Sequence, residues 1–372
     1  MNILVLGGTG VMGRPLARKL ALSNNVFVTT RQKLQPCDGI EYLQGNAKNL
    51  SFLRDTLLNR HWNAIIDFMV WGTEFSEAIP FLLANTDQYL FISSARVYAQ
   101  SDVPITEKTP RLLDVSVDKE YLATNEYALA KAREEDLLFN SGKSNFTIIR
   151  PTITYNTYRL QLGVLEKEGW LYRALHGRSI VFSDDIANKV TTMTFGDDVA
   201  TGITALIGKR DSLGEIFNIT STKSLLWNEV LEIYLDVIER EKGFRPRVVY
   251  TKKSTNLRFK DRVYQVIYCR YFNRSFDNSK IAAYCDVDSF VTPQKGLADC
   301  LREFLANPSF QDIDWRLEAI NDRVAGERTG LSEIPKIRGK IYYLLYRYNM
   351  ELFMPIIRIA EKTAKSLRTV IK

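Results

Sequence analysis

Cysteine and histidine are scarce in this chain. Its 372 residues include four cysteines and two histidines. The thiols are widely spaced, at Cys37, Cys269, Cys285 and Cys300. No Cys-x-x-Cys pair occurs, and only His61 and His176 could serve as additional ligands. This pattern indicates neither a zinc site nor a disulfide framework, so we expect no metal and buried or inert thiols.

A long uncharged apolar run is also missing. No stretch reaches the roughly 18 uncharged residues that a membrane-spanning helix needs. The chain opens on an apolar strand pattern at residues 3–6, which leaves no room for the charged and apolar regions of a signal peptide. We therefore expect a cytoplasmic protein.

Excess positive charge is absent from most of the chain, although the formal net charge is +7. Residues 331–372 hold nine Lys/Arg and three Glu, whereas residues 1–330 hold 41 Lys/Arg against 40 Asp/Glu. A nearly neutral body argues against nucleic acid as a partner. The tail reads as helical over residues 342–371, interrupted at Pro355. It is either a helix packed on the body or a partner subunit, or a basic amphipathic helix at the inner face of the membrane.

What the chain does contain is a glycine-rich turn between a strand pattern and a helix pattern. Residues 3–6 are apolar, residues 7–13 read Gly-Gly-Thr-Gly-Val-Met-Gly, and residues 11–22 have helical periodicity. At such a corner, backbone N–H groups and the helix N-terminus face a pyrophosphate. We therefore predict an NAD or NADP site with contacts from Gly7, Gly10, Val11, Met12 and Gly13.

Strand-like runs alternate with helical stretches along the first half of the chain. The runs cover residues 3–6, 26–30, 64–68, 89–93 and 146–150. This alternation predicts an α/β fold of the Rossmann type, with a doubly wound parallel sheet that binds ligands at the carboxyl ends of its strands.

The pattern loosens after Pro151. Residues 162–175, 199–207 and 227–239 look helical, residues 216–219 look like a strand, and residues 252–271 are rich in Arg, Lys and Tyr. We expect a dinucleotide-binding domain at 1–155 and a smaller α/β substrate lobe at 156–330, with some elements returning to the first domain. A basic helical tail would follow at 331–372.

Two short segments carry groups that could perform chemistry. Tyr127 and Lys131 form the only Tyr-x-x-x-Lys in the chain, and they fall in the helical stretch 125–138. An i, i+4 pair lies on one helix face, where an ammonium favours the phenolate and prepares a general acid/base. Ser93 and Ser94 end the strand pattern at 89–93, where a hydroxyl can hydrogen-bond a reacting oxygen.

Together these segments resemble the extended branch of the short-chain dehydrogenase/reductase superfamily, the nucleotide-sugar epimerases, dehydratases and reductases. The resemblance covers roughly residues 1–320 and includes Ser-Ser-x-x-Val-Tyr at 93–98, Arg-Pro-x-x-x-Tyr at 150–155 and Asp-Val-Ala at 198–200. It implies a nucleotide-sugar substrate and a homodimer through the helix that carries the tyrosine. We interpret Asp198 mainly as an acidic N-cap.

The resemblance also assigns roles to individual residues. Tyr127 would be the proton donor, Lys131 would bind the nicotinamide ribose, and Pro151 would lie beside the nicotinamide. Ser94 would be the catalytic serine, with Ser93 as the alternative. The substrate side would comprise Ser94, Arg96 and Arg274. Arg274 lies where extended members often place a diphosphate-binding arginine, although it could be an ordinary surface charge.

Three departures from the family pattern narrow the expected chemistry. Thr30 stands where NAD-preferring members place an Asp, and Arg31 follows, which favours a 2′-phosphate and therefore NADP over NAD. Asn46 replaces the usual Asp at the adenine contact. Ala95 and Arg96 replace the acid–base pair of the 4,6-dehydratases, which argues against dehydration.

Three functions remain open. NADPH is consumed by a ketoreductase at each turnover, so Arg31 favours a reductase, most similar to the dTDP-4-dehydro-6-deoxyglucose reductases of bacterial surface-polysaccharide (O-antigen) pathways. An NAD-dependent nucleotide-sugar 4-epimerase is the alternative. A non-catalytic NAD(P)- or RNA-binding regulatory protein is the alternative from another class, disfavoured because Tyr127 and Lys131 are both present.

Overall fold

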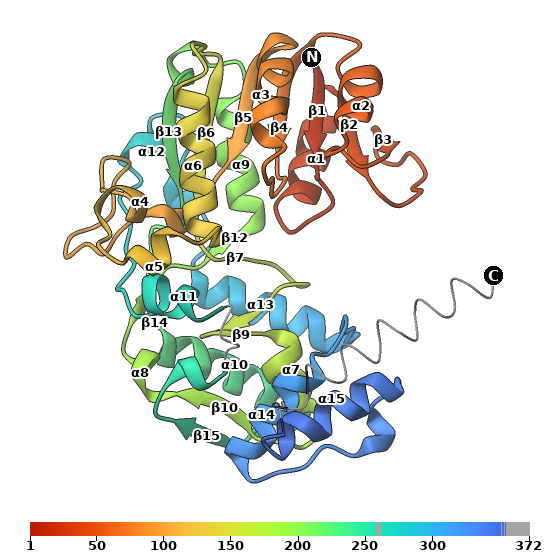
Figure 1. Ribbon diagram of the computed structural model, residues 1–372, viewed down its shortest axis with the longest axis vertical. Coiled ribbons are helices and arrows are strands. Elements are labelled where there is room, and N and C mark those ends of the chain that lie inside the picture. Colours follow the sequence, from red (N-terminus) through yellow and green to blue (C-terminus); the bar gives the residue numbers. More distant parts are fainter. Residues whose placement is uncertain (258–261, 351, 353, 355–372) are drawn as a thin grey trace.

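The structure is a computed structural model that describes the whole chain except residues 258–261, 351, 353 and 355–372. Two lobes are visible in Figure 1, one around a large sheet and one dominated by helices. The predicted helix around Pro355 lies outside the described residues. None of the described helices combines the length and the apolar character that crossing a membrane requires.

A seven-stranded parallel sheet forms the first lobe and confirms the predicted Rossmann-type fold. The strands lie in the order β13-β6-β5-β4-β1-β2-β3. They are β1 (Asn2–Leu6), β2 (Asn25–Thr30), β3 (Ile40–Gln44), β4 (Trp62–Asp67), β5 (Thr86–Ile92), β6 (Phe146–Pro151) and β13 (Glu215–Ile219). All pairings are parallel. The strand predicted at 216–219 is therefore the outer strand of this sheet, far along the chain from the others.

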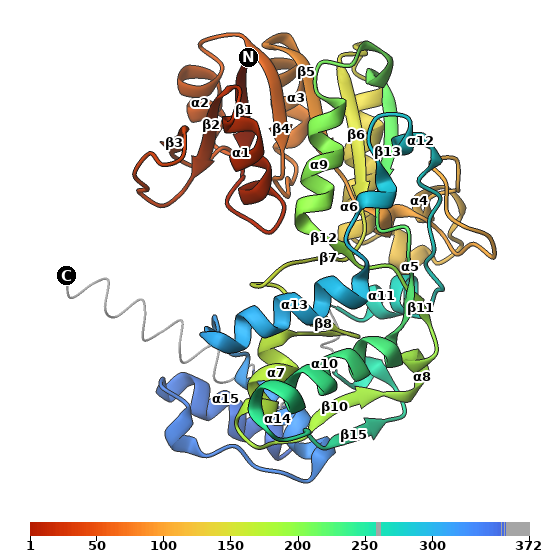
Figure 2. The same cartoon turned by 180° about the vertical axis from the view of Figure 1, so that it is seen from behind.

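Helices cover both faces of the sheet because its strands are apolar on both sides. Ile3 and Val5 pack with α1 (Gly13–Ala21) and α9 (Gly196–Leu206). Leu4 and Leu6 belong to the core that α3 (Phe75–Ala84) and α6 (Tyr127–Phe139) cover. Figure 2 shows α9 on the face opposite the one where α6 lies in Figure 1. The predicted dimer through α6 stays a prediction.

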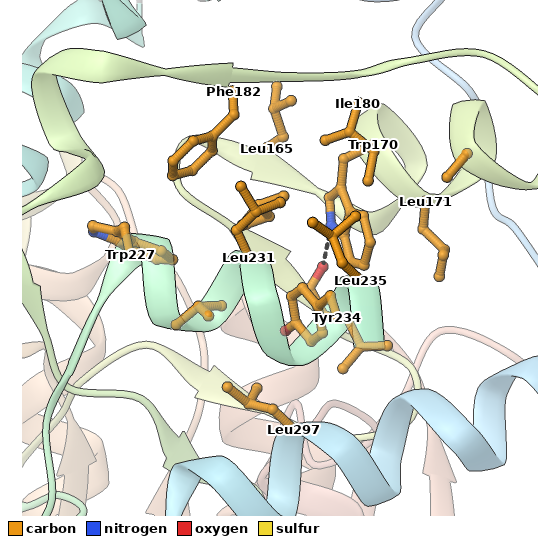
Figure 3. Close-up of a cluster of buried hydrophobic side chains, with 14 of the residues drawn as sticks. Leu165, Trp170, Leu171, Ile180, Phe182, Trp227, Leu231, Tyr234, Leu235 and Leu297 are labelled. Carbon is orange, nitrogen blue, oxygen red and sulfur yellow. Dashed lines mark hydrogen bonds between the residues drawn. The ribbon is translucent and has the colours of Figure 1, made fainter. Parts of the chain in front are cut away.

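The second lobe has its own hydrophobic core, drawn in Figure 3. It is built on α7 (Lys167–Leu175), α10 (Trp227–Lys242) and α13 (Pro293–Ala306), with the parallel pair β10 (Ile180–Ser183) and β15 (Val248–Thr251). Trp170 stacks on Tyr234 at 4.6 Å between ring centroids and donates its indole N–H to the Leu160 carbonyl at 3.1 Å. These rings join α7 to α10.

Short elements connect these parts. The helical ones are α2 (Leu50–Phe52), α4 (Leu112–Val115), α5 (Lys119–Leu122), α8 (Asp184–Ala187), α11 (Val263–Gln265) and α12 (Ser279–Ala282). The strands are β7 (Thr154–Tyr155), β8 (Gln161–Leu162), β9 (Leu165–Glu166), β11 (Val190–Thr191), β12 (Thr194–Phe195) and β14 (Leu225–Leu226). The prediction of a helix over all of 162–175 is wrong at its start. Gly163, with φ +57°, turns β8 back onto β9, and the helix begins only at Lys167.

A cluster of buried charges ties the C-terminal helices to the second lobe. Arg173 is fully buried, and its Nη1 pairs with Glu318 at 2.7 Å and with Asp322 at 2.8 Å. Both carboxylates lie on α14 (Trp315–Ala325). The Tyr343 hydroxyl, from α15 (Ile337–Arg347), donates to Asp322 at 2.7 Å. Burial raises the pKa of Glu318 to about 7. The start of the predicted tail therefore packs on the body.

Asp198 is not the N-cap that we predicted. The helix α9 begins at Gly196 after Phe195, so Asp198 lies in its first turn and accepts a hydrogen bond from the Val291 N–H at 2.9 Å. Burial raises the pKa of its carboxyl from 3.8 to about 6. Its role is to join α9 to the segment before α13.

We expect Asp198→Asn to stabilise the protein above neutral pH and to have no effect in acid. The folded protein holds the Asp198 proton more tightly than the unfolded chain, so the wild type loses stability as the pH rises from 3.8 to about 6. Asparagine keeps the acceptor for Val291 and carries no charge. After allowance for solvent screening, the gain should be about 1 kcal/mol at pH 8. Urea unfolding at pH 4 and pH 8 measures it, and a variant less stable than wild type at pH 8 would contradict the assignment.

Candidate active site

A cavity of about 460 Å³ lies at the carboxyl ends of the sheet strands and is walled by residues of both lobes. Eleven of the predicted site residues line it: Gly7, Gly10, Val11, Met12, Gly13, Ser94, Arg96, Tyr127, Lys131, Pro151 and Arg274. Thr30, Arg31 and Asn46 do not line it. Among the described residues, no group of three His, Cys, Asp or Glu side chains is placed to hold a metal ion.

The glycine corner between β1 and α1 has the geometry that a dinucleotide requires. Gly7 has φ +68°, and its N–H donates to the Thr29 hydroxyl at 3.0 Å. A Cβ on Gly13 would lie 2.6 Å from the backbone of Gly8, whereas a Cβ on Gly10 would have no atom within 4 Å. The chain is thus tightly packed on one side and open on the other. The first N–H groups of α1 receive no side-chain cap, so the corner fits a pyrophosphate.

The residues chosen for the adenosine ribose lie at the ends of β2 and β3. The Gly45 N–H donates to the Thr30 carbonyl at 2.8 Å, so Asn46 follows directly beside Thr30. The Thr30 hydroxyl accepts the Gln32 N–H at 3.1 Å, and Arg31 is exposed. A hydroxyl with its proton available and an exposed guanidinium suit a 2′-phosphate.

Tyr127 begins α6 and lies half-buried against Arg96. The Arg96 guanidinium carbon is 5.2 Å from the centroid of the phenol ring, and the same guanidinium pairs with Glu126. Glu126 also caps α6 by accepting the Ala128 N–H at 2.7 Å. The N-terminal end of α6 therefore fixes the tyrosine between a helix cap and a cation. Glu126 was not predicted, although its position next to Tyr127 was a signal for it.

Lys131 is 1% exposed, and its ammonium is held from three sides. It donates to the Met69 carbonyl at 3.0 Å, pairs with Glu134 at 3.0 Å, and lies 4.4 Å from the centroid of the Phe91 ring. Burial raises the pKa of Glu134, and the Lys131 charge opposes that shift. The lysine is positioned before any ligand arrives, with one turn of helix between it and Tyr127.

The structure distinguishes the two adjacent serines. Ser93 donates its hydroxyl to Glu135 at 2.5 Å, and Glu135 also receives Arg150 Nε at 2.8 Å. Ser94 caps the 3₁₀ turn Ala95–Val97 by accepting the Arg96 N–H at 3.2 Å. It also lines the cavity, where its hydroxyl proton can be donated to a ligand. Arg150, at the predicted Arg-Pro strand end, is a buried partner of Glu135, and Pro151 is the residue of that pair that lines the cavity.

Arg274 is not a surface charge. It is 5% exposed, and its Nη2 donates to the Tyr98 and Tyr268 carbonyls at 2.9 and 3.2 Å. Neutral carbonyls leave the positive charge uncompensated, and burial lowers the pKa of the guanidinium. Its place at the substrate diphosphate stays a prediction.

Sequence reasoning missed most of the wall opposite the cofactor corner. Those residues are Arg159, Gln161, Val190, Thr191, Trp227, Gln265, Cys269, Arg270 and Phe272. Several come from the segment 252–271, whose Arg- and Tyr-rich composition was the only signal. The π-helical turn Val266–Arg270 places Cys269 and Arg270 at the cavity.

Comparison with known proteins identifies the family. The model of the NAD dependent epimerase/dehydratase family matches residues 3–220, more than half of the chain. The chain belongs to this family. The match spans the glycine corner, both serines and the Tyr127–Lys131 pair.

One curated relative of this epimerase/dehydratase family member is named for binding rather than for catalysis. A curated relative, the chloroplast stem-loop binding protein of 41 kDa b from Arabidopsis thaliana, is 27% identical over 240 residues. The match covers 60% of this chain and 59% of that protein, so the chain spans about three fifths of the relative's length.

Solved structures share the fold at low sequence identity. The dTDP-glucose 4,6-dehydratase from Bacillus anthracis, in complex with NAD, matches with a TM-score of 0.62 and 17% identity, covering 82% of this chain and 97% of that one. The UDP-glucose 4-epimerase from Bifidobacterium longum, in complex with NAD+ and UDP, matches with a TM-score of 0.62 and 16% identity, covering 83% and 99%. These likenesses establish the fold, with NAD as the cofactor of both neighbours.

Proposed function

We propose that this protein reduces a nucleotide-linked 4-keto sugar with NADPH, such as dTDP-4-dehydro-6-deoxyglucose to dTDP-fucose in bacterial O-antigen biosynthesis. The observation that carries the proposal is the meeting of the glycine corner, Ser94, Tyr127 and Lys131 on one cavity. The glycine corner walls one side of that cavity and the second lobe walls the other, so we place the cofactor along β1 and α1 and the substrate against the second lobe. Family membership supports redox chemistry on a sugar nucleotide.

The proposed roles follow from the geometry. The nicotinamide, when bound, supplies the hydride. Tyr127 donates a proton to the carbonyl oxygen of the substrate, and Ser94 donates a hydrogen bond to the same oxygen. Both interactions strengthen as negative charge develops on that oxygen, which is how such donors lower a barrier. Lys131 binds the nicotinamide ribose. Its positive charge stabilises the phenolate that Tyr127 becomes after it has donated its proton.

Dehydration is disfavoured by the residues at the substrate end. Elimination of water needs an acid and a base beside the sugar, and this chain has Ala95 and Arg96 there. Arg96 is further committed to Glu126. No carboxylate lines the cavity among the residues that the structure describes. Reduction and epimerisation, which need only one acid/base, are compatible with this wall.

An NAD-dependent 4-epimerase is the second candidate, favoured by the solved neighbours that contain NAD. The exposed Arg31 beside Thr30 favours the reductase, because NADPH is the cofactor that cells supply for reduction. The purified protein mixed with NADPH or NADH and dTDP-4-keto-6-deoxyglucose separates the two. The expected result is stoichiometric oxidation of NADPH. Arg31→Ala should weaken the affinity for NADPH about tenfold or more and leave the affinity for NADH unchanged. No oxidation, together with NAD retained from purification, would instead favour the epimerase.

Nucleic acid is a third candidate because the curated relative is named for stem-loop binding. A gel-shift titration with a stem-loop RNA at two salt concentrations tests it. Binding that weakens with salt and survives in Tyr127→Phe would assign a role outside the cavity. The balanced charge of residues 1–330 predicts no such binding by the body of the protein.

A further inference from the structure

The substrate end of the cavity is strongly cationic. Four arginines lie in its described wall, at positions 96, 159, 270 and 274, and no Asp or Glu is found in the described lining of the cavity. Two of these guanidinium groups keep a buried N–H without a partner among the described residues, the Nε of Arg96 and the Nε of Arg274. Arg274 is only 5% exposed, so its unpaired N–H calls for a hydrogen-bond acceptor in the cavity. A guanidinium makes its strongest hydrogen bonds to anions, so the expected acceptor is anionic.

One potential anion on this wall belongs to the protein itself. Cys269 lines the cavity, is 7% exposed, and receives a hydrogen bond from Arg270 Nη1 at 3.0 Å from its Sγ. Arg270 is itself fixed, since Nε donates to the Gly163 carbonyl and Nη2 to the Gln161 side chain, both at 3.0 Å. The guanidinium therefore cannot turn away from the sulfur without breaking two other bonds.

The surrounding charges favour the thiolate. Burial alone raises the pKa of the Cys269 thiol, but the positive charges of Arg270, Arg274 and Arg96 outweigh it, and the net shift is downward. Two arginines of the wall pair with carboxylates that do not line the cavity, Arg96 with Glu126 and Arg159 with Glu166. Arg270 also feels the charge of Glu166 and the repulsion of Arg159.

The other thiols lack this environment. Cys300 is buried, and burial raises its pKa to about 12, with Glu303 acting in the same direction. Burial also raises the pKa of Cys285. Cys37 is exposed and therefore not one of the buried thiols, and whether it is inert stays a prediction. Its sulfur lies 3.8 Å from the Tyr42 hydroxyl.

We propose that Cys269 is a modification site, a thiolate on the substrate wall of the cavity that reacts with hydrogen peroxide and with small anionic electrophiles. The inference rests on the arginine wall and the Arg270–Cys269 contact, and it does not depend on which sugar the protein turns over. With peroxide, the sulfur attacks one oxygen, an S–O bond forms, the O–O bond breaks and hydroxide leaves. The sulfur is oxidised by two electrons to a sulfenic acid, which thiols reduce again. The added oxygen would fill the space beside Arg274 and obstruct the substrate.

The test is labelling of the native full-length chain, with each cysteine quantified by peptide mass spectrometry. Iodoacetamide and iodoacetate form an S–C bond and release iodide. An ordinary thiol should lose about a hundredfold in rate between pH 8.5 and pH 6, whereas Cys269 should lose less than about tenfold. Iodoacetate should be favoured over iodoacetamide at Cys269 by at least about tenfold more than at Cys37, because the wall attracts an anion. Dimedone should trap a peroxide-dependent sulfenic acid at Cys269 alone.

Two variants make the result specific. Cys269→Ser should remove that label and leave the labelling of Cys37 unchanged. Arg270→Gln should give Cys269 the steep pH dependence of an ordinary thiol. If that variant fails to fold, the comparison of Cys269 with Cys37 in the wild-type protein still tests the proposal. Failure of Cys269 to react until urea is added would overturn the proposal. So would a pH slope and a reagent preference equal to those of Cys37.

Discussion

Tyr127→Phe is expected to lower kcat for keto-sugar reduction about a thousandfold with little change in KM. The phenol lines the same cavity as the Ser94 hydroxyl, and loss of a positioned general acid costs about 10²- to 10⁴-fold. Removal of one oxygen leaves the ring under the Arg96 guanidinium, so the cavity keeps its shape. Reduction of dTDP-4-keto-6-deoxyglucose, followed by absorbance of the reduced nicotinamide, measures the loss.

Tyr158→Phe is the matched control, because that tyrosine is 62% exposed. It should retain wild-type kcat. Binding of NADPH to Tyr127→Phe, measured by fluorescence titration, should stay within about threefold of wild type, which separates a chemical loss from a folding loss. Retention of more than about a tenth of wild-type kcat by Tyr127→Phe would remove this residue from the role of proton donor.

The largest expected change in stability comes from Arg150→Met. Arg150 is 2% exposed and donates from Nε and Nη2 to Glu135 at 2.8 and 2.5 Å, and Glu135 is fully buried. Removal of Arg150 leaves the buried Glu135 carboxylate with only a longer contact to a charged partner, Arg111 Nη1 at 3.3 Å, among the described residues. Breaking a buried pair in this way costs about 3 kcal/mol. The urea unfolding midpoint multiplied by the transition slope measures the loss.

A double variant and a surface control sharpen this result. Arg150→Met with Glu135→Leu should recover part of the loss, because neither charge remains buried. Arg245→Met removes an arginine with three carboxylate partners at the surface, and there the loss should stay below about 1 kcal/mol. A loss equal to that of Arg245→Met would show that the Arg150–Glu135 pair contributes nothing beyond a surface contact.

The parallel sheet was predictable because each of its units leaves a local pattern. A buried strand is an apolar run, its helix has a period near four, and the glycine turn between β1 and α1 has its own spacing. Tyr127 and Lys131 were predictable for the same reason, since both lie on one helix. The roles of Ser93 and Ser94 could not be separated locally, because Glu135 and Arg150, which hold Ser93, are 42 and 57 positions away in the chain.

The opposite wall of the cavity had no such local pattern. Gln161, Cys269 and Arg270 meet only because the second lobe folds β8 against a π-helical turn. The sequence also left open that Arg274 is a surface charge. Its hydrogen-bond acceptor, the Tyr98 carbonyl, lies 176 positions earlier, so no local pattern shows the contact. Contacts of this kind depend on tertiary packing, which single-residue types and spacings do not encode.

The buried charges around Arg173 also set an order in which the protein can be completed during synthesis. Glu318 and Asp322 leave the ribosome 145 and 149 residues after Arg173, their guanidinium partner. Until they arrive, closing the second lobe would bury an unpaired cation, which is costly. The last strand of the seven-stranded sheet ends at Ile219, and the core on its α9 face is completed by Ile281, Val287 and Phe290. The lobe that carries the cofactor half of the cavity can therefore close before Glu318 emerges, and the second lobe is finished only when nearly the whole chain has been made.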